Sequence, residues 1–188
     1  MNANIPTSTS HSGKWATVLL AFAMSCFACT ASAKDQVPLK ATSSGHTISS
    51  TVNPDGSQSN IVVEVGVATH SGRYTGVQEV KVGAPQTGVY DPATHTVAIR
   101  FTASGTGTVA NGDTWDWTAE GVVIVPLDAS FMPLPPPYAF HSTWETVGGT
   151  GRFAGVTGHG TAEGFDFGDG TISRIDTGVI STVGSNKK

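Results

Sequence analysis

Short segments with period-two alternation, separated by turn residues, limit the fold of this chain more than any other feature. In the segment 61–68 the odd positions form an apolar row, while Glu64 shares the other face with Gly66 and Ala68, as expected of a strand packed on one side. Glycines and β-branched residues interrupt every candidate window of ten or more residues for an amphipathic helix. The further predicted strands are 77–82, 96–102, 106–109, 114–125, 138–146, 156–167 and 171–183.

About eight strands at near-regular spacing indicate an all-β sandwich or a closed barrel. We favour a single eight-stranded antiparallel β-barrel, because closure removes exposed edges and about eight strands leave room for side chains or one small ligand. The barrel is assigned to residues 61–188, after a flexible segment 34–60 with one strand at 47–52. The prolines of 126–137 predict a stiff, extended loop beside a barrel mouth or at a homo-oligomer contact.

Residues 1–33 have the form of a secretory signal peptide. Lys14 precedes an apolar run at 15–28, and Ala31-Ser32-Ala33 has the small-x-small form, so we expect cleavage after Ala33 and a secreted or periplasmic protein. A membrane anchor is the competing interpretation, but the run is shorter than the ~20 residues that span a bilayer. The residues before Cys26 and Cys29 make a poor lipobox, which argues against a lipoprotein.

The remaining residues 34–188 have the length of one domain and contain no cysteine. Disulfides, thiolate metal sites and a cysteine nucleophile are therefore excluded from this part of the chain. Loss of Lys14 leaves it one unit more negative than the formal net charge of −4 of the whole sequence. An acidic chain without a Lys/Arg cluster argues against nucleic acid or an anionic membrane as a partner.

A glycine-rich corner lies at Val147–Gly158, and a weaker copy of it at Ser71–Val77. Glycines 148, 149 and 151 suit a reversing turn, and Arg152 and Phe153 supply a charged anchor and an apolar plug beside it. We read the two copies as equivalent corners of a meander whose halves resemble each other. The corner describes a scaffold and contains no catalytic motif.

The same corner resembles the Gly-Gly-(Thr/Ser)-Gly-x-Phe-x-x-(Ala/Val)-x-Gly stretch of plant dirigent proteins and allene oxide cyclases. Residues 60–182 look like the bacterial secreted proteins that are placed with them. The resemblance implies a calycin-like eight-stranded barrel around an apolar pocket. Members of this superfamily steer radical coupling, cyclise a reactive oxide, or have no known activity, and they imply no cofactor. The pocket carboxylates of the family match no positions here, so only the corner carries the resemblance.

Aromatic residues recur on one side of two predicted strands. Trp115 and Trp117 alternate with Asp116, so both indoles point to the side opposite the carboxylate. Phe140 and Trp144 likewise share one face of their strand with small hydroxyl residues. Two interpretations stay open for this set, the aromatic wall of a ligand pocket and ordinary barrel core. The candidate ligand-binding residues are Phe101, Trp115, Trp117, Phe140 and Trp144.

Glu64 is the candidate catalytic residue, because it lies within a strongly apolar strand. Burial there would raise its pKa and place a proton donor or acceptor at the cavity, although the ordinary position of a lone strand carboxylate is outward in solvent. The histidines of residues 34–188 show no short ligand spacing, so no metal site is expected. The other acid–base candidates are Arg100, Asp116, Glu120, His70, His95, His141 and Glu145.

Three classes of function fit these features. The first is an exported barrel that holds a small apolar organic molecule and steers its cyclisation, isomerisation or stereoselective coupling, without a cofactor. The second is a binding protein that uses the same cavity without turnover, and the third is an envelope interaction domain with a filled barrel. A cavity of ~300 Å³ or more with an ionisable group on its wall favours the first class, and a filled interior favours the third.

Overall fold

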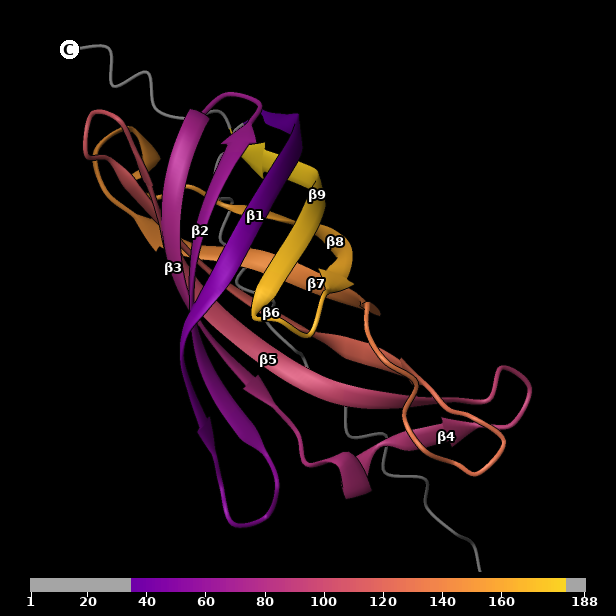
Figure 1. Cartoon of the computed structure of the whole chain (residues 1–188). Helices are drawn as coiled ribbons and strands as arrows, with labels where there is room; N and C mark the ends of the chain where they lie inside the picture. Colours follow the sequence, from indigo (N-terminus) through magenta and orange to yellow (C-terminus); the bar gives the residue numbers. More distant parts are fainter. Residues whose placement is uncertain (1–34, 182–188) are drawn as a thin grey trace, which may run out of the picture. The chain divides into compact units, whose positions relative to one another are not determined.

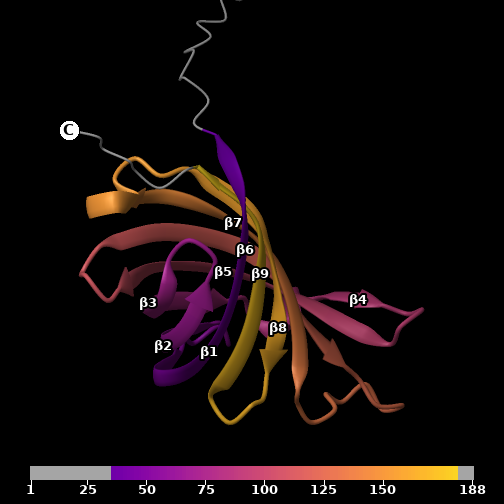
Figure 2. The same cartoon turned by 90° about the horizontal axis from the view of Figure 1, so that it is seen from above.

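The computed structural model describes residues 35–181, which form a closed antiparallel β-barrel (Figures 1 and 2). The strands neighbour one another in the order β3-β2-β1-β9-β8-β7-β6-β5, and pairing of β3 with β5 closes the barrel. Among these residues no helix is long and apolar enough to cross a membrane. The barrel strands are β1 (Gln36–Val52), β2 (Gln58–Ala68), β3 (Gly72–Val82), β5 (Thr96–Val109), β6 (Thr114–Pro126), β7 (Tyr138–Gly149), β8 (Gly158–Asp166) and β9 (Thr171–Ser181).

The number of barrel strands agrees with the prediction, but two segments differ from it. Residues 34–60 were expected to be largely flexible, whereas β1 takes up 36–52 and pairs with both β2 and β9. The expected strands 96–102 and 106–109 form the single strand β5. The expected signal peptide, with its cleavage site after Ala33, lies outside the described residues.

A short extra strand, β4 (Val89–Asp91), pairs with the start of β5 after the 3-10 turn η1 (Pro85–Thr87). Figure 1 shows this hairpin projecting to one side of the barrel together with the adjoining ends of β5 and β6. The proline-rich loop at 127–137 packs on the hairpin, where the Phe131 ring lies 5.6 Å from that of Tyr90 and 5.1 Å from that of His95. The predicted stiff loop therefore lies against β4.

On β2 the face that carries Glu64 points into the barrel, although a lone carboxylate on a strand ordinarily points outward into solvent. Glu64 is only 3% exposed, whereas Val65 and Val67 on the alternate face are 59% and 53% exposed. The inner face of this strand carries Val62, Glu64 and Ala68, and Val65 and Val67 lie on the outer wall. The outward valines continue onto β3, where Val77 pairs with Val63.

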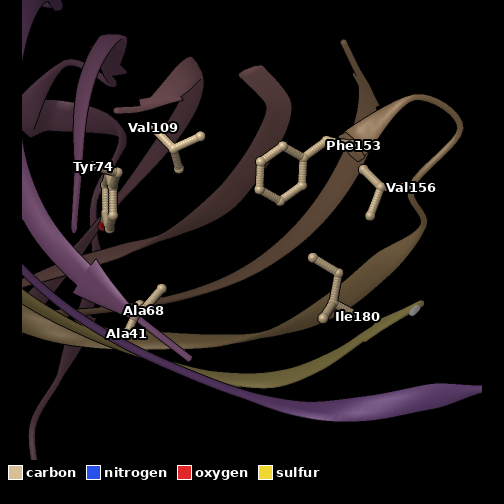
Figure 3. Close-up of a cluster of buried hydrophobic side chains, with 7 residues drawn as sticks. All are labelled: Ala41, Ala68, Tyr74, Val109, Phe153, Val156 and Ile180. Atoms are coloured by element: carbon tan, nitrogen blue, oxygen red, sulfur yellow. The ribbon is translucent and has the colours of Figure 1, made fainter. Parts of the chain in front are cut away.

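Two apolar clusters fill much of the barrel. The first surrounds Phe153, and Figure 3 shows its ring between Tyr74 and Val156. The second contains Phe101, Trp117 and Phe140, with the Phe101 and Phe140 rings edge to face at 6.0 Å between centroids. A layer of polar side chains lies between these clusters, and it positions the candidate site.

The predicted glycine corner forms the turn η2 (Gly151–Phe153), which directs Phe153 into the barrel until its side chain is 1% exposed. Gly151 and Gly72 both have positive φ, at 55° and 75°, which glycine adopts without a steric penalty. The two similar corners meet, because Arg152 Nη2 donates a hydrogen bond to the carbonyl oxygen of Ser71 at 3.1 Å. Arg152 and Phe153 thus have the expected roles of anchor and plug.

Candidate functional site

A hydrogen-bonded layer of polar side chains crosses the barrel interior, and we call it the polar layer. Arg174 lies at its centre: Nε donates to Asp176 Oδ2 at 3.0 Å, Nη2 to Glu64 Oε1 at 3.2 Å, and Nη1 to Gln78 Oε1 at 3.3 Å. Gln78 Nε2 and Ser43 Oγ each lie 3.4 Å from Glu64 Oε2, to which they donate. The layer consists of Ser43, Glu64, Gln78, Arg174 and Asp176.

Strand register explains how residues far apart in sequence meet here. Ser43 on β1 is paired with Arg174 on β9, and on β2 Glu64 is paired with Gly76 of β3. A Cβ atom on Gly76 would lie 2.8 Å from Glu64 Oε1, so the glycine leaves the space that the carboxylate occupies. The barrel wall therefore has a recess at the position where the buried acid needs room.

The electrostatics of the layer follow from its burial. Burial raises the pKa of the Glu64 carboxyl above its usual range, and the attraction of Arg174 only partly opposes this shift. Burial raises the pKa of Asp176 in the same way. Burial acts to lower the pKa of Arg174, but Asp176 and Glu64 together raise it, so the guanidinium stays charged. The Arg174 guanidinium also lies over the Trp117 ring, 4.9 Å from its centroid.

Two interior cavities lie against the polar layer, and Arg174 lines both of them. The corner-side cavity, next to the glycine corners, has a volume of about 60 Å³ and is lined by Ser71, Tyr74, Trp115, Trp144 and Phe153, with Glu64, Arg174 and Asp176 on its wall. The far-side cavity, of about 100 Å³, is lined by Val80, Phe101 and Phe140, among others, and Arg174 also reaches it. Both volumes are below the ~300 Å³ of an ordinary ligand pocket.

The five aromatic candidates all lie on the inner side of the wall. Trp115 and Trp144 line the corner-side cavity, Phe101 and Phe140 line the far-side cavity, and Trp117 contacts both. The Trp115 ring lies 5.0 Å from the Tyr74 ring and 5.2 Å from the Phe153 ring. Sequence parity grouped Trp115 with Trp117 and Phe140 with Trp144 and left open which face is inside. The role of these residues as ligand contacts remains a prediction.

Sequence reasoning missed Arg174, Asp176 and Gln78. A signal for the first two exists in β9, where they interrupt the row formed by Ile172, Gly178 and Ile180. Charged residues in an otherwise apolar row of a strand indicate either a buried ionic cluster or a row that faces solvent. Which of the two applies depends on the residues that the neighbouring strands bring close. Here Ser43 on β1 and Glu64 on β2 complete the cluster.

The other acid–base candidates lie away from the polar layer. Arg100, Glu120, His141 and Glu145 are exposed. Asp116 accepts a hydrogen bond from Thr106 Oγ1 at 2.6 Å, on the side of β6 opposite the indoles. The rings of His70 and His95 contact the backbone oxygens of Pro38 and Leu127, each at 3.0 Å. Of the acid–base residues singled out from the sequence, Glu64 alone lines one of the two interior cavities of the described barrel.

No family model, curated protein or solved structure matches this chain. The resemblance to dirigent proteins and allene oxide cyclases therefore remains a prediction based on the glycine corner. Within residues 35–181 no group of three or more His, Cys, Asp or Glu side chains is arranged to hold a metal ion. The polar layer and its two cavities are the features from which a function can be argued.

Proposed function

We propose that this protein holds a small apolar organic molecule in the corner-side cavity, after export through its N-terminal segment. The observation that carries the proposal is a cavity with aromatic walls and three buried charged groups, Glu64, Arg174 and Asp176, on one side. Buried charged groups that are costly to desolvate are typical of functional sites. The apolar walls favour the ligand's hydrocarbon part, and the charged groups orient its polar end.

Cavity size limits the ligand. A dry apolar cavity of ~150 Å³ accommodates benzene in another protein, and the corner-side cavity has about 60 Å³. A short alkyl chain fits this space more readily than a ring, and a larger ligand requires Trp115 or Trp144 to move. We therefore propose a slim ligand, or the slim end of a larger one.

Turnover of the bound molecule is the extension of this proposal that the polar layer favours. The raised pKa of Glu64 and Asp176 makes each carboxyl a proton donor or acceptor closer to neutral pH. Held in one conformer away from water, a flexible substrate would need little more for cofactor-free cyclisation, isomerisation or guided coupling. The small volume of both interior cavities favours the interaction-domain alternative. The exposed Val65, Val67 and Val77 on the outer wall support the same alternative.

Tryptophan fluorescence tests the binding proposal, because Trp115, Trp117 and Trp144 are the tryptophans of residues 34–188. The protein would be titrated with a panel of apolar aromatic, alkyl and polyunsaturated molecules, and we expect saturable quenching by slim members. Ala41→Val narrows the corner-side cavity, and the matched change Ala103→Val narrows the far-side cavity. Ala41→Val alone should weaken binding.

A flat titration across the panel, from protein shown to be folded by circular dichroism, would refute the proposal in favour of the interaction domain. Weaker binding in Ala103→Val and not in Ala41→Val would move the ligand to the far-side cavity. For a ligand that binds, product analysis with the wild type and with Glu64→Gln separates turnover from simple binding. Product formed by the wild type and lost in a Glu64→Gln variant that still binds would support an enzyme.

A further inference from the structure

The positive and negative charges on the wall of the corner-side cavity do not sum to zero. Glu64 and Asp176 carry carboxylates, and Arg174 carries the one guanidinium among the described residues that line this cavity. The other polar groups there are hydroxyls of Ser71, Tyr74, Ser142 and Thr146. With both acids ionised, the wall has one negative charge more than it has positive charges.

Arg174 is already occupied by partners within the barrel. Three of its nitrogens donate to Asp176, Glu64 and Gln78, and its guanidinium is stacked over Trp117. An anionic ligand would have to compete with two carboxylates for this cation. The geometry therefore disfavours a carboxylate or phosphate in the corner-side cavity.

Asp176, in contrast, retains an acceptor for a ligand. Its Oδ2 accepts from Arg174 Nε, while Oδ1 has no hydrogen-bond partner within residues 35–181, and the side chain is 11% exposed. An ionised carboxylate can accept several hydrogen bonds, so Oδ1 is free to accept one from a donor in the cavity. A positively charged donor makes the stronger bond of this kind.

The aromatic walls also favour a positively charged ligand. Tyr74, Trp115 and Phe153 form a continuous row of rings with centroids 5.0 and 5.2 Å apart. Trp144 lines the same cavity. The faces of aromatic rings carry partial negative charge and attract cations, most strongly where water is excluded.

We propose that the corner-side cavity selects a small organic cation, with its ammonium group at Asp176 and Glu64 and its hydrocarbon part against the aromatic row. This inference rests on the proposed binding function and specifies the class of ligand. A primary alkylamine has three donors at one end, which suit the free carboxylate oxygen, and a slim apolar chain that the cavity admits when Trp115 or Trp144 moves.

The test uses three probes with one alkyl chain and different charge: butylammonium, butan-1-ol and butyrate, each titrated at pH 7 against tryptophan fluorescence. We expect butylammonium to bind at least about tenfold more tightly than butan-1-ol, and butyrate more weakly than either. Equal affinity for butylammonium and butan-1-ol, or tightest binding of butyrate, would overturn the charge inference and leave the proposed binding function standing. If none of the three binds and the apolar panel is also silent, both proposals fail.

Variants test whether the preference for butylammonium depends on the carboxylates of the polar layer. Asp176→Asn should reduce the affinity for butylammonium by about tenfold and leave that for butan-1-ol unchanged. Asp116→Asn removes a carboxylate from the outer side of β6 and is the matched control, which should change neither affinity. Equal weakening of both probes in Asp176→Asn would indicate a structural role and overturn the inference. If that variant does not fold, Glu64→Gln provides the same comparison.

Discussion

Replacing Arg174 by methionine is the change that tests the structure most directly. The methionine keeps much of the apolar stem but removes the hydrogen bonds to Asp176, Glu64 and Gln78 and the contact with Trp117. Two carboxylates would then remain buried without a cation. Removing one partner of a buried ion pair costs about 3–5 kcal/mol, which lowers the melting temperature of a domain of this size by about 6–20 °C.

Thermal unfolding followed by circular dichroism at pH 7 measures this loss. Arg100→Met is the matched control, because Arg100 is exposed on β5 and should change the melting temperature very little. The loss in Arg174→Met should be smaller at pH 5 than at pH 8, because protonation relieves the unpaired carboxylates. Adding Glu64→Gln and Asp176→Asn to Arg174→Met should restore much of the stability. If the melting temperature of Arg174→Met falls no more than that of Arg100→Met, the central role of the Arg174 guanidinium is refuted.

Three further predictions concern pH and packing. Because burial raises the pKa of Glu64 above 4.5, the folded protein retains a proton that the unfolded chain releases, so the free energy of unfolding should fall as pH rises above 4.5. In urea denaturation, Glu64→Gln should make the free energy of unfolding depend less on pH. An unchanged pH dependence in this variant would contradict the assignment to Glu64. Phe153→Ala should cost about 3–5 kcal/mol in the same assay because the ring is fully buried, and a loss below about 1 kcal/mol would show that the plug is dispensable. Gly105→Ala would place its Cβ 2.8 Å from Trp117 Cζ2 and 2.9 Å from the backbone oxygen of Val77. We expect it to cost about 1–3 kcal/mol and alter the near-UV dichroism, and an unaltered spectrum would argue against this contact.

The alternation of side chains predicted an all-β sandwich or barrel, and the removal of exposed edges favoured the barrel, but composition concealed much of one strand. Most of β1 between Thr42 and Thr51 consists of Ser, Thr, Gly and His, which resembles a loop. It forms a strand because β2 and β9 supply backbone partners on both of its edges, a tertiary effect that outweighs local propensity. The expected interruption at 103–105 is absent, because β5 runs unbroken from Thr96 to Val109. Gly105 and Gly107 within it leave space for Trp117 and Trp115 on the adjacent strand.

The candidate site was predictable only in part, because parity tells which residues share a face and not which face is inside. Glu64 could be singled out as an acid in an apolar strand, yet Val65 and Val67 made the opposite face look like the core. Closure of the barrel decides which of the two faces of β2 is inside. Arg174 and Asp176 reach Glu64 from a strand more than a hundred positions away, and this proximity exists only once β1 has paired with both β2 and β9.

The polar layer gives the barrel interior two cavities with different linings, which share Trp117, Ala119, Ser142 and Arg174. The shared Arg174 guanidinium is held by three side chains and lies over the Trp117 ring. A substitution at a residue that lines one cavity alone, such as Ala41 or Val80, therefore alters that lining only, whereas a change at Arg174 alters both.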